Sequence, residues 1–325
     1  MDTELHYGLR GKKKQQWADF LARAGLEADE NTDSTVLIWE ADTLAATGSR
    51  KGNLLKCIAV DDAFQGQGLT ATVLTQLRQD AFAAGYNHLF LYTKPKNLLQ
   101  FQSLFFYPVA QTDQVLLMED KPQGINRFLD TLAPVKAGGR IGALVMNCNP
   151  FTLGHRYVIE TAAKECDHVY VFVLSEEQRP FPAADRLRLV REGTQDLENV
   201  TVFPTGPYLI SSTTFPTYFL KDRDQAVTAQ CGLDIAVFSR YYIPKFGITH
   251  RYVGTEPASL LTNAYNCALK AQLPIPVVEI PRLEAGEAPI SASTVRSLLG
   301  SGQAEKVRTL VPPTTFDYLE KNNFL

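Results

Sequence analysis

Apolar and polar positions follow two different patterns along this chain, and the clearer one lies in its second half. After Arg140, short apolar runs typical of strands buried on both faces alternate with longer stretches whose apolar positions recur at helical spacing. This alternation predicts a parallel sheet with helices on both faces, in a doubly wound, Rossmann-like arrangement. The predicted strands cover residues 141–146, 168–174, 200–203, 251–254 and 277–280. The predicted helices cover residues 155–165, 183–197, 215–230 and 259–272.

The first 120 residues show a mixed pattern that predicts a separate α+β domain. Helical spacing covers residues 15–24 and 71–84, strand-like runs cover 35–39, 42–47, 54–60 and 88–93, and an aromatic helix-to-strand segment covers 97–109. Lys121-Pro122-Gln123-Gly124 then breaks a strand, and a Pro/Gly linker at 134–139 follows a short predicted helix at 125–132. We therefore expect a first domain over residues 1–120, a linker with a short helix over 121–139, and a second domain over 140–325.

Composition narrows the class of protein. The net charge is −3, from 32 basic and 35 acidic residues, so no overall basic field favours nucleic acid or an anionic membrane. No apolar run approaches the roughly 20 residues that span a bilayer, and the acidic start of the chain argues against a signal peptide. The five cysteines include no Cys-x-x-Cys pair, which favours free thiols over disulfides or a zinc site. We expect a cytoplasmic protein that binds neither nucleic acid nor a membrane.

A glycine-containing loop lies between the predicted strand 54–60 and the predicted helix 71–84. Its residues Gln65, Gly66, Gln67 and Gly68 allow the backbone to approach a ligand, and N–H groups at the helix start can hold a pyrophosphate. A Gly-x-Gly by itself is as well explained by a turn. The loop and its flanking elements resemble the acyl-CoA-binding core of the GNAT acetyltransferases, which carry Gln/Arg-x-x-Gly-x-Gly/Ala between a central strand and a helix. The resemblance implies that these four residues bind a CoA-like group.

Two features depart from the GNAT pattern. The predicted strand 54–60 carries no carboxylate that could act as a general base for an amine, and Thr70 stands where the family keeps a very small residue. We therefore expect this domain to hold a CoA-like group without transferring acetyl from it.

The second domain has its own candidate loop, Asn149 to His155, directly after the predicted strand 141–146. In an α/β sheet this is where phosphates bind, because the first helical turn presents unpaired N–H groups and the positive end of the helix dipole. Gly154 permits close packing of the helix start, and His155 can donate from its imidazole to an anionic oxygen. A histidine at a helix start is, taken alone, more often structural.

A late motif, Ile290-Ser291-Ala292-Ser293-Thr294-Val295-Arg296, places three hydroxyls at another predicted helix start and an arginine one turn later. Alone it is an N-cap. Together with Thr152-Leu153-Gly154-His155 it resembles the nucleotidyltransferase superfamily, which carries His/Thr-x-Gly-His early and Ile-Ser-x-Ser/Thr-x-x-Arg late. The fold expected is thus α/β, with a GNAT-like α+β domain followed by a Rossmann-like nucleotidyltransferase domain. The candidate catalytic residues are Thr152, His155 and Arg296, and the candidate nucleotide-binding residues are Asn149, Pro150, Phe151, Gly154, Glu256, Ser291, Ser293 and Thr294.

The order of the two domains is similar to that of the citrate lyase ligase family. Further stretches carry the same similarity, at residues 185–190, 214–221, 247–257, 262–266 and 311–315. The resemblance implies that acetate attacks the α-phosphate of ATP and pyrophosphate leaves. The resulting acetyl-AMP then acetylates the thiol of the phosphoribosyl-dephospho-CoA group on the citrate lyase acyl carrier subunit. Mg²⁺ would arrive with the nucleotide, so no protein-built metal site is expected.

Two alternatives remain open on the residues alone. One is an adenylyltransferase that makes a dinucleotide-type product and carries a fused acyl-CoA sensor domain. The other is a CoA-dependent amine acetyltransferase whose second domain only binds nucleotide. Beyond the motifs, five charged residues are further candidates that surface ion pairs explain equally well: Arg179, Asp185, Arg186, Lys221 and Glu256.

Overall fold

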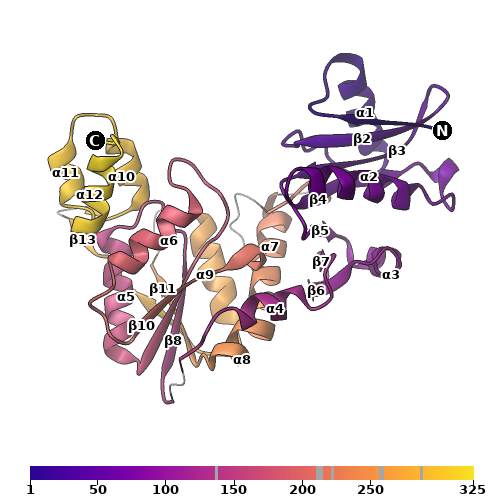
Figure 1. Ribbon diagram of the computed structural model, residues 1–325. Helices are drawn as coiled ribbons and strands as arrows, with labels where there is room; N and C mark the ends of the chain where they lie inside the picture. The colour runs from indigo at the N-terminus through magenta and orange to yellow at the C-terminus, as the bar shows by residue number, and fades with distance from the viewer. Residues whose placement is uncertain (136–137, 210–214, 221–222, 256–259, 286–287) are drawn as a thin grey trace. The chain divides into compact units, whose positions relative to one another are not determined.

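The computed structural model of the chain describes residues 1–135, 138–209, 215–220, 223–255, 260–285 and 288–325. These residues form two compact units (Figure 1). Unit 1 comprises Met1–Ile125 and Pro216–Leu233, and unit 2 comprises Asn126–Phe215 and Asp234–Leu325. The sequence boundaries included no return of the chain to the first unit, so the placement of Pro216–Leu233 is a finding of the structure.

Unit 1 is built on a seven-stranded sheet with the order β1-β2-β3-β4-β5-β7-β6. The strands are β1 (Asp2–His6), β2 (Ser34–Glu40), β3 (Thr43–Lys51), β4 (Leu54–Val60), β5 (Phe90–Thr93), β6 (Tyr107–Gln111) and β7 (Leu116–Glu119). Neighbouring strands are antiparallel except β4 and β5. These two parallel strands pair only at Leu54 with Phe90 and at Leu55 with Leu91. The second half of β4 therefore has no ladder partner on β5.

Helices complete unit 1, and α2 is the one that organises its core. The helices before residue 124 are α1 (Gly11–Arg23), α2 (Leu69–Ala83) and α3 (Leu98–Gln102), with short turns η1 (Asp62–Phe64) and η2 (Pro95–Asn97). α2 packs against β2, β3 and β4, and its Val73, Leu74 and Leu77 are fully buried because helical spacing places them on one face. Gly48 on β3 lets this helix approach closely, since a Cβ there would lie 2.4 Å from Val73 Cγ1.

Unit 2 contains the predicted parallel sheet. Its order is β10 (Val200–Pro204), β9 (His168–Val173), β8 (Ile141–Met146), β11 (His250–Gly254) and β12 (Val277–Ile280), with every neighbouring pair parallel. The chain leaves β8 in the middle, runs outward to β9 and β10, and returns to β11 on the other side. α5 (Leu153–Glu165) and α6 (Ala183–Glu192) lie on one side of the sheet and α9 (Leu260–Gln272) on the other (Figure 1). The switch in direction, where such sheets bind ligands, therefore lies at the carboxyl ends of β8 and β11.

Three short helices follow the sheet and form a second core within unit 2. They are α10 (Ala292–Leu298), α11 (Ala304–Arg308) and α12 (Pro313–Lys321), preceded by the small hairpin of β13 (Glu284–Ala285) and β14 (Ala288–Pro289). Buried Phe181 from the loop before α6 packs with Ile290 and Val295 of this group. The late motif thus packs against the loop before α6 through an apolar contact.

Three predicted helices were wrong in their bounds, and one of them, expected at residues 15–24, is α1 (Gly11–Arg23). The helix expected at residues 183–197 ends at Glu192, with Gly193 as its C-cap. The helix expected at 215–230 is α7 (Arg223–Val237), which continues through the π-helical turn η4 (Phe238–Tyr242) into α8 (Ile243–Phe246), while residues 215–220 are not helical. Tyr218 and Phe219 belong to unit 1 and are buried there. Their burial explains why residues 215–220 carry apolar side chains although they form no helix. The short helix expected at 125–132 is α4 (Gly124–Asp130), and η3 (Gly206–Tyr208) follows β10.

None of the helices that the structure describes has the length and hydropathy of a membrane span. All five cysteines are free, and four of them are buried.

Candidate functional site

The loop after β8 ends in a tightly capped helix start. Thr152 is the N-cap of α5, and its Oγ1 accepts a hydrogen bond from the backbone N–H of His155 at 3.3 Å. In return, His155 Nδ1 accepts from the backbone N–H of Thr152 at 3.1 Å and lies 2.8 Å from Thr152 Oγ1. This reciprocal capping box uses a histidine at the position where Glu or Gln is usual. The Asn149–Pro150 peptide that leads into it is cis.

The capping box also fixes the tautomer of His155. Because Nδ1 accepts a backbone N–H, the ring proton of the neutral imidazole is assigned to Nε2. Burial, together with the charge of Arg282, lowers the pKa of His155 to about 4. The ring stacks on buried Phe151, with centroids 6.1 Å apart and planes 17° apart. His155 is therefore a neutral, rigidly held donor near pH 7, suited to an anionic oxygen without adding a positive charge of its own.

The late motif forms the start of α10. Ser291 is the N-cap, and its Oγ accepts from the backbone N–H of Thr294 at 3.1 Å. The hydroxyls of Ser293 and Thr294 each lie 2.8 Å from Ser291 Oγ. All three hydroxyls thus gather at one partly exposed helix terminus. Phosphate oxygens can accept hydrogen bonds from such hydroxyl groups and from the N–H groups of the helix start.

The structure brings the two motifs into direct contact. A Cβ on Gly154 would lie 2.7 Å from the carbonyl oxygen of Ile290, so only glycine allows α5 to pass this close to the late motif. Arg296 Nη1 donates to the carbonyl oxygen of Asn149, which ties α10 to the loop after β8. Leu153 N–H donates to Leu310 O at 2.9 Å and adds a third link. Residues about 140 positions apart in sequence therefore form one site at the carboxyl edge of the sheet.

Arg186 links the loops at this edge of the sheet by hydrogen bonds. It is completely buried, and its guanidinium donates to the carbonyl oxygens of Asn147 and Phe181 at 2.8 and 3.2 Å and to that of Glu176. It also donates to Asn147 Oδ1 at 2.6 Å. Burial lowers the pKa of Arg186. These contacts make Arg186 a support of the loops that follow β8 and β9.

The side-chain amide of Asn149 forms hydrogen bonds within the described residues through its nitrogen only. Its Nδ2 donates to Gln178 Oε1 at 3.1 Å and to Arg179 O at 3.3 Å. Its Oδ1 is buried and has no hydrogen-bond partner among the described residues. A buried amide oxygen without a partner is costly, so it is a candidate acceptor for a ligand donor at this loop.

Arg282 is a site residue that the sequence did not single out. It follows β12 and is partly buried. Its side-chain Nε donates to Thr255 O at 2.8 Å, and its backbone N–H donates to Thr255 Oγ1 at 3.1 Å. Its charge acts on His155. The only sequence signal was its position after a strand, at the edge where such sheets bind ligands. The candidates Glu256 and Lys221 lie outside the described residues.

No group of three His, Cys, Asp or Glu side chains among the described residues has the geometry to hold an ion.

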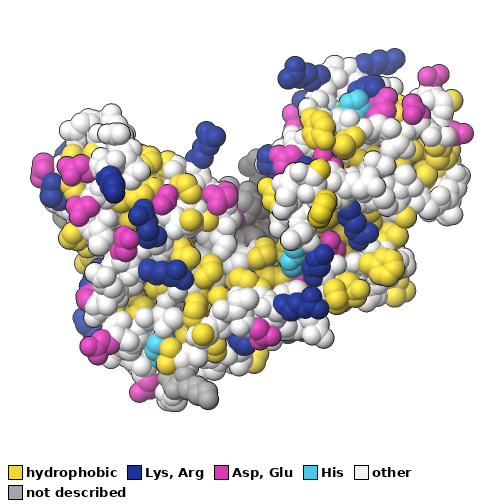
Figure 2. Space-filling view, viewed as in Figure 1, with side chains coloured by type: hydrophobic (Ala, Val, Ile, Leu, Met, Phe, Trp, Pro, Cys, Tyr) yellow, Lys and Arg dark blue, Asp and Glu magenta, His cyan; other side chains and the backbone are white. Residues whose placement is uncertain are grey.

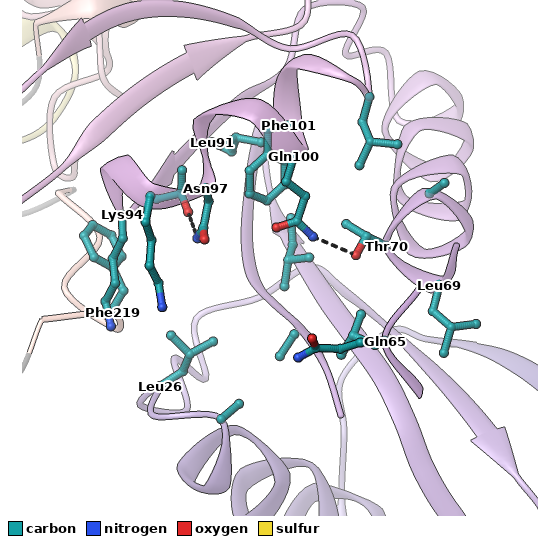
Figure 3. A pocket seen from close by; sticks show the side chains of 18 of the residues that line it. Leu26, Gln65, Leu69, Thr70, Leu91, Lys94, Asn97, Gln100, Phe101 and Phe219 are labelled. Carbon is teal, nitrogen blue, oxygen red and sulfur yellow. Dashed lines mark hydrogen bonds between the residues drawn. The ribbon is translucent and has the colours of Figure 1, made fainter. Parts of the chain in front are cut away.

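Unit 1 contains a separate pocket of about 700 Å³, which opens where β4 and β5 part (Figure 3). Ile58, Ala59 and Val60 form one wall, and Leu91, Tyr92 and Thr93 form another. Gln65, Gly66 and Gly68 line it together with Leu69 and Thr70 at the start of α2, whereas Gln67 is exposed and is not a lining residue. Gln100 Nε2 donates to Thr70 Oγ1 at 3.2 Å, so α3 lies across from the start of α2.

The glycines of this loop have the conformation expected of a ligand-binding turn. Gly66 and Gly68 have φ of +78° and +75°, and a Cβ on either would meet no atom within 4 Å. Gly68 is the N-cap of α2, so the first N–H groups of that helix lie beside open space. The one acidic lining residue among those described, Asp62, accepts from Gln65 Nε2 at 2.6 Å.

Tyr218 and Phe219 complete the pocket from a distant part of the chain. Tyr218 O accepts from the backbone N–H of Glu27 at 2.7 Å, and its hydroxyl donates to Tyr92 O at 3.1 Å. Two buried aromatic residues from the Pro216–Leu233 segment therefore wall the pocket beside the end of β5.

Known proteins resemble this chain over nearly all of its length. The family model for the citrate lyase ligase C-terminal domain matches residues 141–319, more than half of the chain. The [citrate [pro-3S]-lyase] ligase of Klebsiella pneumoniae is 39% identical over 321 residues, which is 96% of this chain and 94% of that protein. The protein of the same name from Escherichia coli K12 is 37% identical over 319 residues, covering 95% and 91%. The chain belongs to the citrate lyase ligase family.

Membership of this family confirms the resemblance drawn from the sequence, and it makes the chain one of a family of ligases. Among solved structures, Thermotoga maritima TmcAL bound with alpha-thio ATP covers 57% of this chain and 56% of its own, at 16% identity and a TM-score of 0.36. At that TM-score the likeness adds nothing to what the two sheets establish.

Proposed function

We propose that the protein catalyses the ATP-dependent acetylation of the thiol on the phosphoribosyl-dephospho-CoA group of the citrate lyase acyl carrier subunit. The reaction passes through acetyl-AMP and releases AMP and pyrophosphate. The observation that carries this proposal is the contact between the two motifs, in which Gly154 lies against Ile290 O and Arg296 is bonded to Asn149 O. That contact gathers a neutral histidine, an arginine and a hydroxyl-rich helix start at one edge of the sheet. The names of the family members, which are ligases directed at citrate lyase, support a ligation with citrate lyase as its target.

In the first step a carboxylate oxygen of acetate attacks the α-phosphorus of ATP. The new O–P bond forms as the bond to the β,γ-pyrophosphate breaks, so negative charge builds on the leaving group. His155 would donate from Nε2 to an α-phosphate oxygen, and Arg296, the hydroxyls of Ser291 and Ser293, and the N–H groups of α10 would stabilise the pyrophosphate. Magnesium carried by the nucleotide neutralises phosphate charge.

The protein needs no nucleophile of its own in this scheme. Cys148, the thiol nearest the loop in sequence, is completely buried, and burial raises its pKa far above the ordinary range. In the second step the carrier thiolate attacks the acetyl carbon, and AMP leaves as the C–O bond breaks. Catalysis then rests on position and on preorganised charge.

Unit 1 would bind the CoA-derived arm. The pocket between β4 and β5 offers apolar walls for an extended chain, and the start of α2 offers N–H groups for its pyrophosphate. Asp62, the one acidic lining residue among those described, accepts a hydrogen bond from Gln65, so it is not a free carboxylate poised for an amine proton. This argues against the amine acetyltransferase.

Pyrophosphate release tests the reaction. The enzyme is assayed with ATP and Mg²⁺, with and without acetate, and with and without the thiol-form carrier subunit. We expect release to require acetate and to become multiple-turnover only with the carrier. Release without acetate, together with a dinucleotide product from a phosphate ester, would instead establish the adenylyltransferase.

A glycine pair tests the pocket. Gly66→Ala/Gly68→Ala places Cβ atoms at left-handed backbone positions beside the pocket and should raise the KM for the carrier subunit about tenfold, with the KM for ATP unchanged. Gly85→Ala is the matched control, because Gly85 also has a positive φ (+88°) and open space but lies beyond the far end of α2. An unchanged carrier KM in the double variant would remove the pocket from the proposal.

A further inference from the structure

Two large apolar side chains are exposed beside the unit 1 pocket. Leu99 on α3 is 78% exposed, and Phe105, three residues after that helix, is 70% exposed. The residues between and beside them, Gln100, Phe101 and Leu104, line the pocket. Figure 2 shows hydrophobic side chains gathered over α3, with Lys or Arg side chains nearby. Exposed large apolar side chains next to residues that line a pocket are candidates for a protein contact.

The backbone holds Phe105 in this exposed position. Its φ is +62°, a conformation that a bulky residue adopts only where its surroundings enforce it. The preceding carbonyl, Leu104 O, accepts from Arg78 Nη2 at 2.7 Å, and the guanidinium of Arg78 lies 4.8 Å from the Phe106 ring centroid. Phe105 N–H donates to Gln102 O at 3.1 Å. The segment is fixed on both sides of Phe105, so the exposed ring is preorganised.

The same mouth is basic. Lys94 and Lys96 both line the pocket, and neither forms an ion pair with any residue that the structure describes. Lys94 extends into the pocket beside Phe219 (Figure 3). Lys96 is exposed. The one lining acid among the described residues, Asp62, is on the opposite loop and is bonded to Gln65. The rim at η2 and α3 therefore favours an acidic partner.

We propose that Leu99, Phe105 and Lys96, here called the α3 face, are the docking surface for the carrier subunit whose arm enters the pocket. This inference rests on the proposed function. An arm whose pyrophosphate lies at the start of α2 joins its carrier beyond the phosphates. The Gln100–Thr70 hydrogen bond places α3 directly across from that helix start. If the arm leaves the pocket on that side, the body of the carrier lies over α3, where the apolar and basic side chains are. The carrier should present an acidic surface with a small apolar patch.

Binding of two probes to the full-length protein tests the α3 face. One probe is the thiol-form carrier subunit, and the other is free dephospho-CoA, which contains the arm but no carrier. The variant is Leu99→Gln/Phe105→Asn, since Gln keeps helix propensity and Asn tolerates a positive φ. We expect the Kd for the carrier to rise tenfold or more, as for loss of an aromatic anchor, with the Kd for dephospho-CoA unchanged. Lys96→Glu should also raise the Kd for the carrier, and the rise should be larger at low salt than at high salt.

Phe82→Gln is the matched control. Phe82 is 76% exposed in the same unit but lies near the far end of α2, about 20 Å along the helix from the pocket. It should leave both Kd values unchanged. Equal loss in this control, equal weakening of both probes by the double variant, or an unchanged carrier Kd would each overturn the docking surface. Failure of the proposed function is distinguishable, because the wild-type protein would then release no pyrophosphate in response to acetate.

Discussion

Gly154→Ala is the sharpest test of the contact between the two motifs. The added Cβ would lie 2.7 Å from Ile290 O, about 0.7 Å short of ordinary van der Waals contact at 3.4 Å. The neighbouring atom belongs to the backbone, so it cannot rotate away as a flexible side chain would. α5 and the start of α10 must separate by several tenths of an ångström, which pulls His155 away from Ser291 and Arg296.

Two opposing terms set the effect on stability. Overpacking of this kind costs about 1–3 kcal/mol, while alanine gains up to about 1 kcal/mol over glycine inside a helix. The net loss is then about 0–3 kcal/mol, a range too wide to be diagnostic. Catalysis has no such compensation, because a displacement approaching 1 Å in a positioned site can cost up to about a hundredfold in rate.

We therefore expect kcat/KM for ATP to fall roughly tenfold to a hundredfold in Gly154→Ala, at an assay temperature below the melting temperature of the variant. The measurement is acetate-dependent pyrophosphate release across an ATP titration, beside a thermal melt. Gly138→Ala is the control, since a Cβ there meets nothing within 4 Å and its φ is ordinary. Wild-type kcat/KM in Gly154→Ala would refute the reasoning that the two motifs act as one site.

Three further predictions concern the same unit. His155 has a pKa of about 4 in the folded protein and about 6.5 in the unfolded chain. Between these pH values the unfolded chain binds more protons, so the stability of the protein falls as the pH falls through that window. The melting temperature of His155→Gln should therefore fall less than that of the wild type between pH 7 and 4.5. Arg282→Gln should raise the pKa of His155, measured by NMR titration of its ring, and an unchanged pKa would place Arg282 outside the site. Arg186→Met leaves three carbonyl oxygens without their donor, so it should destabilise unit 2 by about 3 kcal/mol or more and lower the melting temperature by roughly 6–12 °C.

The sequence predicted those parts of the fold in which burial leaves a local pattern. Residues 54–60 and 141–146 were placed within a residue of β4 and β8, because a strand buried in a sheet must be apolar along a continuous run. β1 was missed because its residues, Asp2–His6, are mostly polar and lie at the edge of the sheet, where no hydrophobic alternation is required.

The candidate site was predictable to the extent that its residues form motifs. Thr152, His155 and Ser291 stand at helix starts, where capping imposes a readable spacing. Arg282 follows a strand without such spacing, and its proximity to His155 arises only from the fold. The contribution of Tyr218 to the unit 1 pocket could not be predicted either. No local pattern in residues 215–220 indicates that their apolar side chains pack in unit 1.

The segment Pro216–Leu233 also decides how this chain can be divided. The backbone passes between the two units after Ile125, after Phe215 and after Leu233, rather than once at a linker. A fragment cut at residue 140 would leave the first unit without the aromatic wall of its pocket and would expose Tyr218 and Phe219 on the second. Both fragments should aggregate or fold poorly, whereas a circular permutation that keeps these three crossings intact should not. A fragment that is to keep the pocket of unit 1 intact must therefore include both Met1–Ile125 and Pro216–Leu233.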